Sequence, residues 1–157
     1  YSLAILKRDK KALATLIDRS AALNVAREIA VPMKLNRRID FLEGDLFDTL
    51  YGTGYQTVLY SNILHIYNER QNKTIFRKIH KALEPSGRII LNDLFLKDNR
   101  LEPYNAALFS LTMLLYTARG KAYTFNETER MLKETGFYKF KRFPISRGSS
   151  LIEAIKK

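Results

Sequence analysis

The chain has 157 residues, of which 46% are hydrophobic and 27% are charged, and its net charge at pH 7 is +11. This length suits one domain with a sizeable core, and the composition is ordinary for a globular protein. The absence of cysteine excludes disulfides, thiolate metal sites and thiol nucleophiles, and the presence of only two histidines argues against a histidine-rich metal site.

The positive charge raises nucleic acid as a partner. The basic residues are spread along the chain, however, and no arginine-rich or aromatic-interleaved segment appears. Solvated surface charge is therefore the favoured interpretation, with nucleic acid a possible but not favoured partner. No apolar run approaches the length of a membrane span, and the first residues do not resemble a signal peptide. We therefore expect a cytoplasmic protein with no membrane contact.

The first part of the chain alternates predicted helices and strands. After the end of a helix at residues 2–6, residues 12–17 form a predicted strand that ends on Asp18. A helix follows from Ser20, a good N-cap, and should stop near Pro32. Residues 38–43 alternate charged and apolar side chains as a strand does, and Gly44-Asp45 ends that strand.

The middle of the chain contains the stretch around which the rest is organised. Residues 58–60 are β-branched and large apolar residues, which indicates a strand buried in a sheet interior. Asn68 and Gln71 match a capping box, and they predict a helix with an apolar face that ends at residues 85–87. His80 lies beside that face and is interpreted as a surface histidine. Another buried strand follows at residues 88–92, and Asp93 marks its carboxyl end.

The last part of the chain predicts two helices and two strands. Pro103 suits the first position of a helix that continues through Tyr116 and ends at Gly120. This helix is apolar nearly all round, so more than one of its faces should be covered. Asn126 with Glu129 matches another capping box. Two strands, at about 138–143 and 150–155, are joined by Pro144 to Gly148, which is long enough for a hairpin but too short for a crossover helix.

This order of elements predicts the fold class. Alternating strands and helices imply an α/β sandwich with a mostly parallel sheet, and the hairpin at the end makes one of the last strands antiparallel. In an open parallel sheet, ligands bind in the crevice outside the carboxyl ends of the strands. The polar residues at the strand ends are therefore the candidates for a site: Asp18, Asp45, Ser61, Asn62 and Asp93.

His65 lies just past the carboxyl end of the strand at residues 58–60. A histidine delivered to that crevice is a candidate proton acceptor, because its free pKa lies near neutrality. Asp18 falls where nucleotide-binding α/β folds place the acid that accepts hydrogen bonds from ribose hydroxyls. Aspartate and Gly-Asp are also common in turns, so the spacing of the whole set is more informative than any single member.

Taken together, these motifs resemble a known family. The chain is similar to the S-adenosylmethionine-dependent O-methyltransferases of the plant caffeate and bacterial hydroxyneurosporene type, and the resemblance runs from about residue 1 to the end. The segments that carry it are Asp18, residues 44–47, residues 61–65, residues 83–89, Asp93, residues 120–124, Glu127 and residues 136–137.

The resemblance implies a site residue by residue. Asp18 corresponds to the acid that binds the cofactor ribose, and Asp45, after Gly44, to the acid near the adenine amino group. Leu46 and Phe47 correspond to residues that pack beside the adenine ring, and Ser61 and Asn62 to residues that line the methionine end. S-adenosylmethionine is the implied cofactor, with S-adenosylhomocysteine as product, and no metal is implied.

His65 corresponds to the family's general base, and Asp93 to the acidic residue that orients it. The family usually has His-Asp-Trp where this chain has His65-Ile66-Tyr67, and a longer glutamate where it has Asp93. The acceptor implied is a small aromatic or hydrophobic hydroxyl compound. The apolar helix would line its pocket with Phe109, Met113 and Tyr116, or would instead be plain core or a dimer interface.

The sequence contains no first strand followed by a Gly-rich turn, which a cofactor site of this kind needs. It also has no counterpart of the helical N-terminal domain through which the family dimerises. We therefore expect residues 1–157 to be the C-terminal part of a Rossmann-like methyltransferase domain, from a protein that forms a homodimer through the remainder. The alternatives are a nucleic-acid-binding or RNA-modifying protein on the same fold and a non-catalytic cofactor-binding relative.

Overall fold

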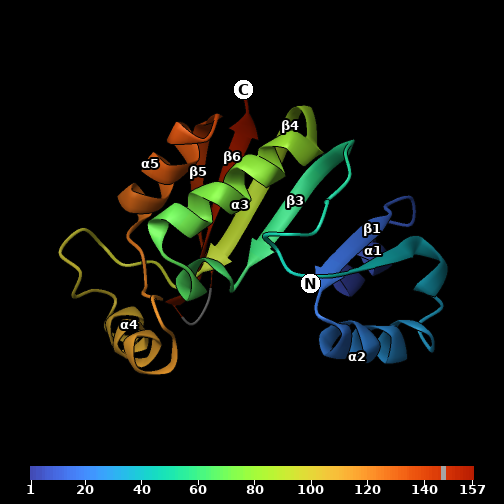
Figure 1. The fold of residues 1–157 in the computed structure, drawn as a ribbon, viewed down its shortest axis with the longest axis horizontal. Coiled ribbons are helices and arrows are strands. Elements are labelled where there is room, and N and C mark those ends of the chain that lie inside the picture. Colours follow the sequence, from blue (N-terminus) through green and yellow to red (C-terminus); the bar gives the residue numbers. More distant parts are fainter. Residues whose placement is uncertain (146–147) are drawn as a thin grey trace. The chain divides into compact units, whose positions relative to one another are not determined.

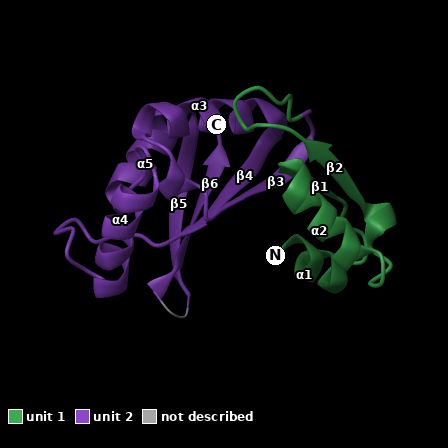
Figure 2. Cartoon of the chain, turned by 60° about the horizontal axis from the view of Figure 1, so that its bottom comes forward, with its two compact units in different colours: residues 1–51 green, residues 52–157 purple. Residues whose placement is uncertain are grey.

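A computed structural model describes residues 1–145 and 148–157 of the chain. The chain divides into two compact units, unit 1 from Tyr1 to Tyr51 and unit 2 from Gly52 to Lys157 (Figure 2). Each unit has its own sheet: two strands in unit 1 and four in unit 2. The two units are therefore described separately below.

Unit 1 is a helix–strand–helix–strand unit. Its elements are α1 (Ser2–Arg8), β1 (Ala14–Asp18), α2 (Ser20–Ala30), the 3₁₀ turn η1 (Asn36–Arg38) and β2 (Ile39–Glu43). The strands β1 and β2 are parallel and in register from Ala14 opposite Ile39 to Asp18 opposite Glu43. A small core of buried side chains lies beneath them, formed by Leu6, Ala30, Leu35 and Ile39. The strands predicted on either side of α2 are thus present and adjacent.

A single arginine ties together the irregular chain between α1 and β1. The guanidinium of Arg38 donates hydrogen bonds to the carbonyl oxygens of Leu6 (3.0 Å), Asp9 (2.6 Å) and Ala12 (3.0 Å). Backbone carbonyls that leave regular structure need donors, and a fixed guanidinium fork can serve several of them at once. Arg38 therefore holds the entry to β1 beside the start of β2.

Unit 2 contains a four-stranded mixed sheet in the order β3-β4-β6-β5 (Figure 1). The strand β3 is parallel to β4, and β6 is antiparallel to both β4 and β5. This arrangement confirms the predicted α/β class and the antiparallel hairpin at the end of the chain. The bounds of the strands are Tyr55–Ser61 for β3, Leu83–Asp93 for β4, Phe137–Pro144 for β5 and Ser150–Lys156 for β6.

The helices α3 (Glu69–Ala82) and α5 (Phe125–Glu134) pack side by side against this sheet (Figure 1). The apolar stripe predicted for α3 is buried, with Ile75 and Phe76 fully covered. Ion pairs join the two helices on their outer sides, Lys73 with Glu134 at 3.1 Å and Arg130 with Glu69 at 2.8 Å. Helix α4 (Tyr104–Tyr116) instead contacts the turn η2 (Leu64–Ile66) that follows β3.

Two of the three predicted caps are wrong. The box of Asn68 and Gln71 is present at the start of α3, with both reciprocal hydrogen bonds. At α5, however, the box is formed by Thr124 and Glu127 rather than by Asn126 and Glu129. The N-cap of α2 is Arg19 rather than Ser20, and no side-chain cap bond is made there. Ser20 is the first helical residue, and the N–H of Arg19 before it is donated to the Asp18 carboxylate at 2.8 Å.

The burial of two apolar segments also differs from the prediction. The strand β3 is an edge strand in which Tyr60 alone is buried, while Val58 and Leu59 are half-buried. In α4 Ala106 is the only buried residue, so the expectation that several faces are covered is wrong for the described chain. The exposed apolar side chains of this helix are Tyr104, Leu108, Leu111, Leu114, Leu115 and Tyr116.

The C-terminal end of α3 packs against the start of β5 through His80. Its ring meets that of Phe137 edge to face at 5.3 Å, and it fills the space beside Gly136. A Cβ at position 136 would lie 2.6 Å from His80 Nε2, and the backbone there has φ of +99°, so this position requires glycine. The interpretation of His80 as a plain surface histidine is therefore wrong, because it is a half-buried packing residue.

The predicted connection between the last two strands, from Pro144 to Gly148, includes residues 146–147, which lie outside the described residues. Within residues 1–145 and 148–157, no helix is long and apolar enough to cross a membrane.

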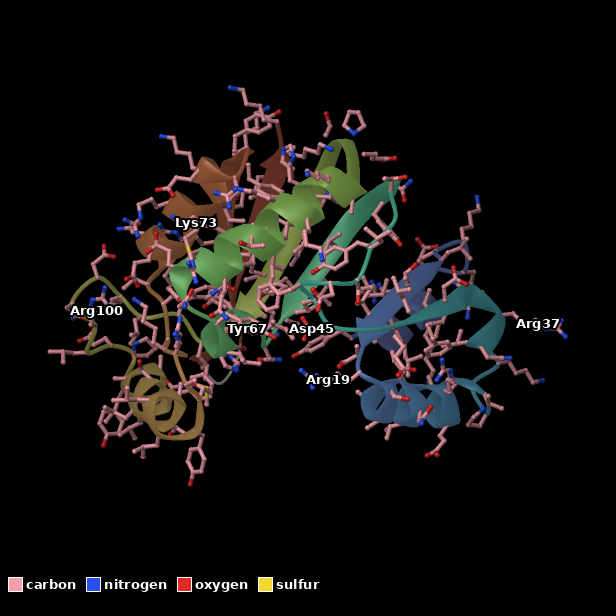
Figure 3. All side chains as sticks on the ribbon, in the orientation of Figure 1. Arg19, Arg37, Asp45, Tyr67, Lys73 and Arg100 are labelled. Carbon is pink, nitrogen blue, oxygen red and sulfur yellow. The ribbon has the colours of Figure 1, made fainter. Side chains whose placement is uncertain are left out.

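We expect Arg38→Ala to destabilise unit 1, because three backbone carbonyls lose charged donors. The loss should be about 1.5–3 kcal/mol in the free energy of unfolding, measured by urea denaturation followed by circular dichroism. The matched control is Arg37→Ala, because Arg37 is exposed and points away from unit 1 (Figure 3). Equal stability of the two variants would contradict the role given to Arg38.

The surroundings of His80 predict a loss of stability in acid. Burial, and then the positive charge of Lys156, lower the pKa of His80 below its usual value of 6.5. The unfolded chain therefore binds the proton first, so stability should fall as pH drops below 6.5 and should level off below the lowered pKa. We expect His80→Gln to remove this part of the pH dependence, as measured by thermal unfolding between pH 5 and 8. An unchanged slope in the variant would exclude His80 as its source.

Candidate active site

In unit 1 the predicted cofactor residues gather where β1 and β2 end. Asp18 closes β1 and Gly44-Asp45 follows β2, and the two strands are parallel neighbours, so their carboxyl ends coincide. The Gly44 N–H donates to the Asp18 carbonyl at 3.1 Å, which joins the two strand ends. The structure thus brings Asp18, Gly44 and Asp45 together, as their positions at strand ends predict.

The loop after β2 is arranged around Asp45. One of its carboxylate oxygens accepts the Phe47 N–H at 2.8 Å, and its carbonyl accepts the Thr49 N–H at 2.9 Å. Its second oxygen faces the guanidinium of Arg19 at 3.4 Å. Both residues of this partly exposed pair are labelled in Figure 3. Leu46 and Phe47, half-buried, belong to this same loop. Asp45 therefore holds the loop through its hydrogen bonds, and its carboxylate remains partly exposed to solvent.

In unit 2 a second polar group forms where β3 and β4 end. The Asn62 N–H donates to the Asn92 carbonyl at 2.9 Å, and the Asn92 side chain donates to Ser61 Oγ at 2.9 Å. Asn62 has φ of +57°, a left-handed conformation that asparagine tolerates better than most residues. This turn lifts the chain off β3 and into the segment that carries His65.

His65 and Asp93 meet across the ends of these two strands. His65 Nδ1 lies 2.8 Å from Asp93 Oδ1 and 3.1 Å from Oδ2. The Asp93 side chain is 3% exposed and that of His65 is 12% exposed. Asp93 Oδ1 also accepts the Leu94 N–H at 2.8 Å. The aspartate is thus long enough to orient His65, although the family more often has a glutamate at this position.

This geometry fixes which nitrogen of His65 can react. A carboxylate only accepts hydrogen bonds, so Nδ1 must carry the proton that is donated to Asp93. In the neutral imidazole the lone pair is then on Nε2, on the side of the ring away from Asp93. A buried carboxylate behind the ring also stabilises the imidazolium that forms when Nε2 takes a proton. Such an arrangement suits a base held by an orienting acid.

The three predicted pocket residues on α4 differ in their placement. The ring of Phe109 packs edge to face on His65, with 4.7 Å between ring centroids. Met113, one turn further along, is half-buried, whereas Tyr116 is 81% exposed. The structure therefore places Phe109 against His65 and leaves Tyr116 at the surface of the described chain.

Sequence reasoning missed Asn92 and Gly120 as parts of this site. Asn92 lies within β4 and carries no motif, so nothing in the sequence distinguishes it from a neutral strand residue. Gly120 lies against the turn that carries His65: a Cβ there would come within 2.3 Å of the His65 carbonyl oxygen. An isolated glycine after a helix was interpreted as a helix stop, but α4 already ends at Tyr116.

A surface cavity lies elsewhere in unit 2, with a volume of about 290 Å³. It contains neither His65 nor Asp93, and its charged groups are largely paired. Arg100, for example, contacts Glu127 at 2.6 Å. Burial alone would raise the pKa of Glu127, but bonds from Thr124, Lys121 and Arg100 hold that pKa below its usual value. The lining residues are Asp98, Arg100, Thr124, Asn126, Glu127 and Arg130.

Over the described ranges, no group of three or more histidine, aspartate or glutamate side chains is arranged to hold a metal ion.

Comparisons with known proteins agree with the fold. A model of the O-methyltransferase domain matches residues 10–138. The chain is 31% identical over 141 residues to acetylserotonin O-methyltransferase of Gallus gallus, which covers 90% of this chain and 39% of the chicken protein. These matches define a methyltransferase class. The chain belongs to the O-methyltransferase domain family.

Solved structures support the same assignment. A candidate O-methyltransferase from Nostoc punctiforme PCC 73102 superimposes with a TM-score of 0.95 at 32% identity, covering 99% of this chain and 47% of that one. The S-adenosylmethionine-dependent methyltransferase SibL superimposes with a TM-score of 0.86 at 28% identity, covering 99% of this chain and 46% of that one. The chain therefore spans less than half the length of these relatives.

Proposed function

We propose that this chain carries the cofactor-binding and catalytic residues of an S-adenosylmethionine-dependent methyltransferase that acts on a hydroxyl of a small aromatic or hydrophobic acceptor. The observation that carries this proposal is the buried contact of His65 Nδ1 with Asp93 at 2.8 Å, which leaves Nε2 as the basic atom. Family membership supports the class of reaction. The names of the relatives supply the cofactor and the hydroxyl acceptor by analogy.

The residues at the strand ends suit the cofactor. The Asp18 carboxylate is exposed at the carboxyl end of β1, where it can accept two ribose hydroxyls. The Asp45 carboxylate can accept the adenine amino group, with Leu46 and Phe47 beside the ring and Gly44 allowing close backbone approach. Ser61 and Asn62 would take the methionine end. The product, S-adenosylhomocysteine, would be held by the same residues.

Bound S-adenosylmethionine supplies a methyl group on a positively charged sulfur, which an oxygen nucleophile can attack in line. The protein must orient the acceptor and remove its proton. His65 Nε2 would accept the proton of the acceptor hydroxyl, while the methyl carbon would bond to the oxygen and its bond to the sulfur would break. Asp93 holds the ring during this step and balances the charge that appears on the imidazole. Neither a metal nor a covalent enzyme intermediate is needed.

The acceptor side is assigned to α4. Phe109 touches the His65 ring, so an aromatic acceptor that reaches Nε2 would pass close to it. Met113 lies one turn further along the same helix and is half-buried, which suits an apolar wall. We include Tyr116 in this pocket as well. Its exposure means that it can cover the acceptor only if the helix is packed against another segment.

We further propose a homodimer in the cytoplasm. Helix α4 exposes several large apolar side chains. Large exposed apolar patches mark surfaces that contact other protein segments. The absence of cysteine is in keeping with a reducing compartment.

The cofactor site is tested by calorimetric titration of the natural full-length polypeptide with S-adenosylmethionine and S-adenosylhomocysteine. We expect Asp18→Ala to weaken binding at least about tenfold, or about 1.4 kcal/mol, because the ribose hydroxyls lose their acceptor. The control is Asp40→Ala, an exposed acid in the middle of β2 rather than at its end. The absence of cofactor binding by the folded wild-type protein would falsify the methyltransferase assignment.

The base is tested by following transfer of labelled methyl from S-adenosylmethionine to caffeate and N-acetylserotonin as probe acceptors. We expect His65→Gln to lower kcat by roughly 10²–10⁴-fold while cofactor affinity changes little, because only proton removal is lost. His80→Gln, which changes the only other histidine, should keep its kcat. Full activity of His65→Gln would assign proton removal to another group. Cofactor binding with no turnover in the wild-type protein would instead indicate a non-catalytic relative.

A further inference from the structure

The turn that carries His65 is held through its backbone by a buried amide. Asn72, on the first turn of α3, is completely buried. Its Nδ2 donates one hydrogen bond to the Leu64 carbonyl and one to the Tyr67 carbonyl, both at 2.9 Å. These carbonyls flank His65 on either side along the chain. The two protons of a single side-chain amide therefore fix both ends of the turn.

The amide is itself held in one orientation. The hydroxyl of Tyr60, on β3, donates to Asn72 Oδ1 at 3.0 Å. If the amide turned over, its NH₂ group would face the Tyr60 hydroxyl and its oxygen would face two carbonyl oxygens. The Tyr60 ring is also fixed, because it packs edge to face on Phe76 of α3 at 5.7 Å. The clamp is thus joined to the sheet and to the core of α3.

A second clamp approaches the turn from the segment before α5. The hydroxyl of Tyr123, itself 1% exposed, donates to the same Tyr67 carbonyl at 2.7 Å. The Lys121 N–H donates to the His65 carbonyl at 3.0 Å. Burial raises the pKa of Tyr123 to about 12, so its hydroxyl remains a donor throughout the neutral range. All three carbonyls, of residues 64, 65 and 67, therefore have donors from outside the turn.

We propose that Asn72, supported by Tyr123, is a positioning residue for His65: the two side chains clamp the carbonyls around the turn so that the imidazole meets Asp93 through Nδ1 and presents Nε2. This inference rests on the proposed function only for its catalytic consequence. A displacement of about 1 Å in a reacting group can cost on the order of 10²-fold in rate, which is why such a clamp matters.

Buried hydrogen bonds also stabilise a fold without any role at a site. A control with the same kind of bond is available at the end of α5. The Thr135 hydroxyl is buried and shares its one proton between the Met131 and Leu132 carbonyls, at 2.9 and 3.0 Å. Thr135→Val removes this buried side-chain donor to backbone carbonyls, as a change at Asn72 does, but the carbonyls belong to α5 rather than to the turn that carries His65.

The test is nuclear magnetic resonance of ¹⁵N-histidine-labelled natural full-length polypeptide, which needs neither acceptor nor turnover. His65→Gln identifies the signals of His65, because they are absent from the spectrum of that variant. In the wild type we expect His65 as one tautomer, with a slowly exchanging proton on Nδ1. Tyr123→Phe and Asn72→Ala should mix the tautomers and speed exchange of that proton at least about tenfold, whereas Thr135→Val should do neither. If Asn72→Ala does not fold, the shape-conserving Tyr123→Phe carries the test alone.

Kinetics supply the second arm of the test in a protein that turns over caffeate or N-acetylserotonin. We expect Asn72→Ala and Tyr123→Phe to lower kcat at least about tenfold with the KM for S-adenosylmethionine within about twofold. An unchanged Nδ1 signal in the folded variants, or an equal effect of Thr135→Val, overturns the positioning role. Full activity of His65→Gln alongside a disturbed Nδ1 signal in Asn72→Ala overturns only the proposed base.

Discussion

The interaction on which unit 2 depends is the contact of His65 with a buried carboxylate. The Asp93 side chain is 3% exposed, and an isolated carboxylate at that depth would be strongly destabilised. It is accommodated because His65 Nδ1 and the Leu94 N–H both donate to it. This requires β3 and β4 to be parallel neighbours, with Ser61 opposite Asn92, so that the residues after each strand emerge at the same edge. The contact between His65 and Asp93 therefore depends on the parallel pairing of β3 with β4.

The other half of that constraint is the backbone of the turn. A short 3₁₀ turn has poor internal hydrogen bonding, so residues 64–67 would have several directions open to them if they were left alone. Asn72 comes from α3 and Tyr123 from the segment before α5, and these elements are joined further out by Lys73 with Glu134 and Arg130 with Glu69. The packing of α3 against α5 thereby contributes to the position of the His65 ring.

Features of the fold that depend on residues close together in the chain could be predicted from the sequence. The elements of residues 14–43 and the box of Asn68 with Gln71 follow from nearby residues, and so do the acids at the strand ends. At α5 two capping patterns overlap, and local rules cannot choose between them. The extended backbone at Thr124, which bridges to Leu96, makes Thr124 the N-cap. The sequence could not reveal this choice, because Leu96 lies 28 residues before it.

The same reasoning explains what could not be predicted in the site. Asn72 lies five residues after Tyr67, and Tyr123 lies 56 residues after it, so neither bond to the Tyr67 carbonyl follows from a motif. Helix α4 was misjudged for a related reason: an apolar helix indicates that something covers it, but its sequence does not say whether that cover comes from the described residues.

The departure of His65-Ile66-Tyr67 from the usual His-Asp-Trp also has a structural explanation. The clamps on the turn act on the carbonyl oxygens of residues 64, 65 and 67, which every amino acid has. The side chain of Ile66 is partly exposed, so it can differ without disturbing those bonds. The position of His65 is therefore set by donors elsewhere in the fold, at Asn72, Lys121 and Tyr123. A change of side chain at residue 66 therefore leaves these bonds to the turn in place as long as those donors remain.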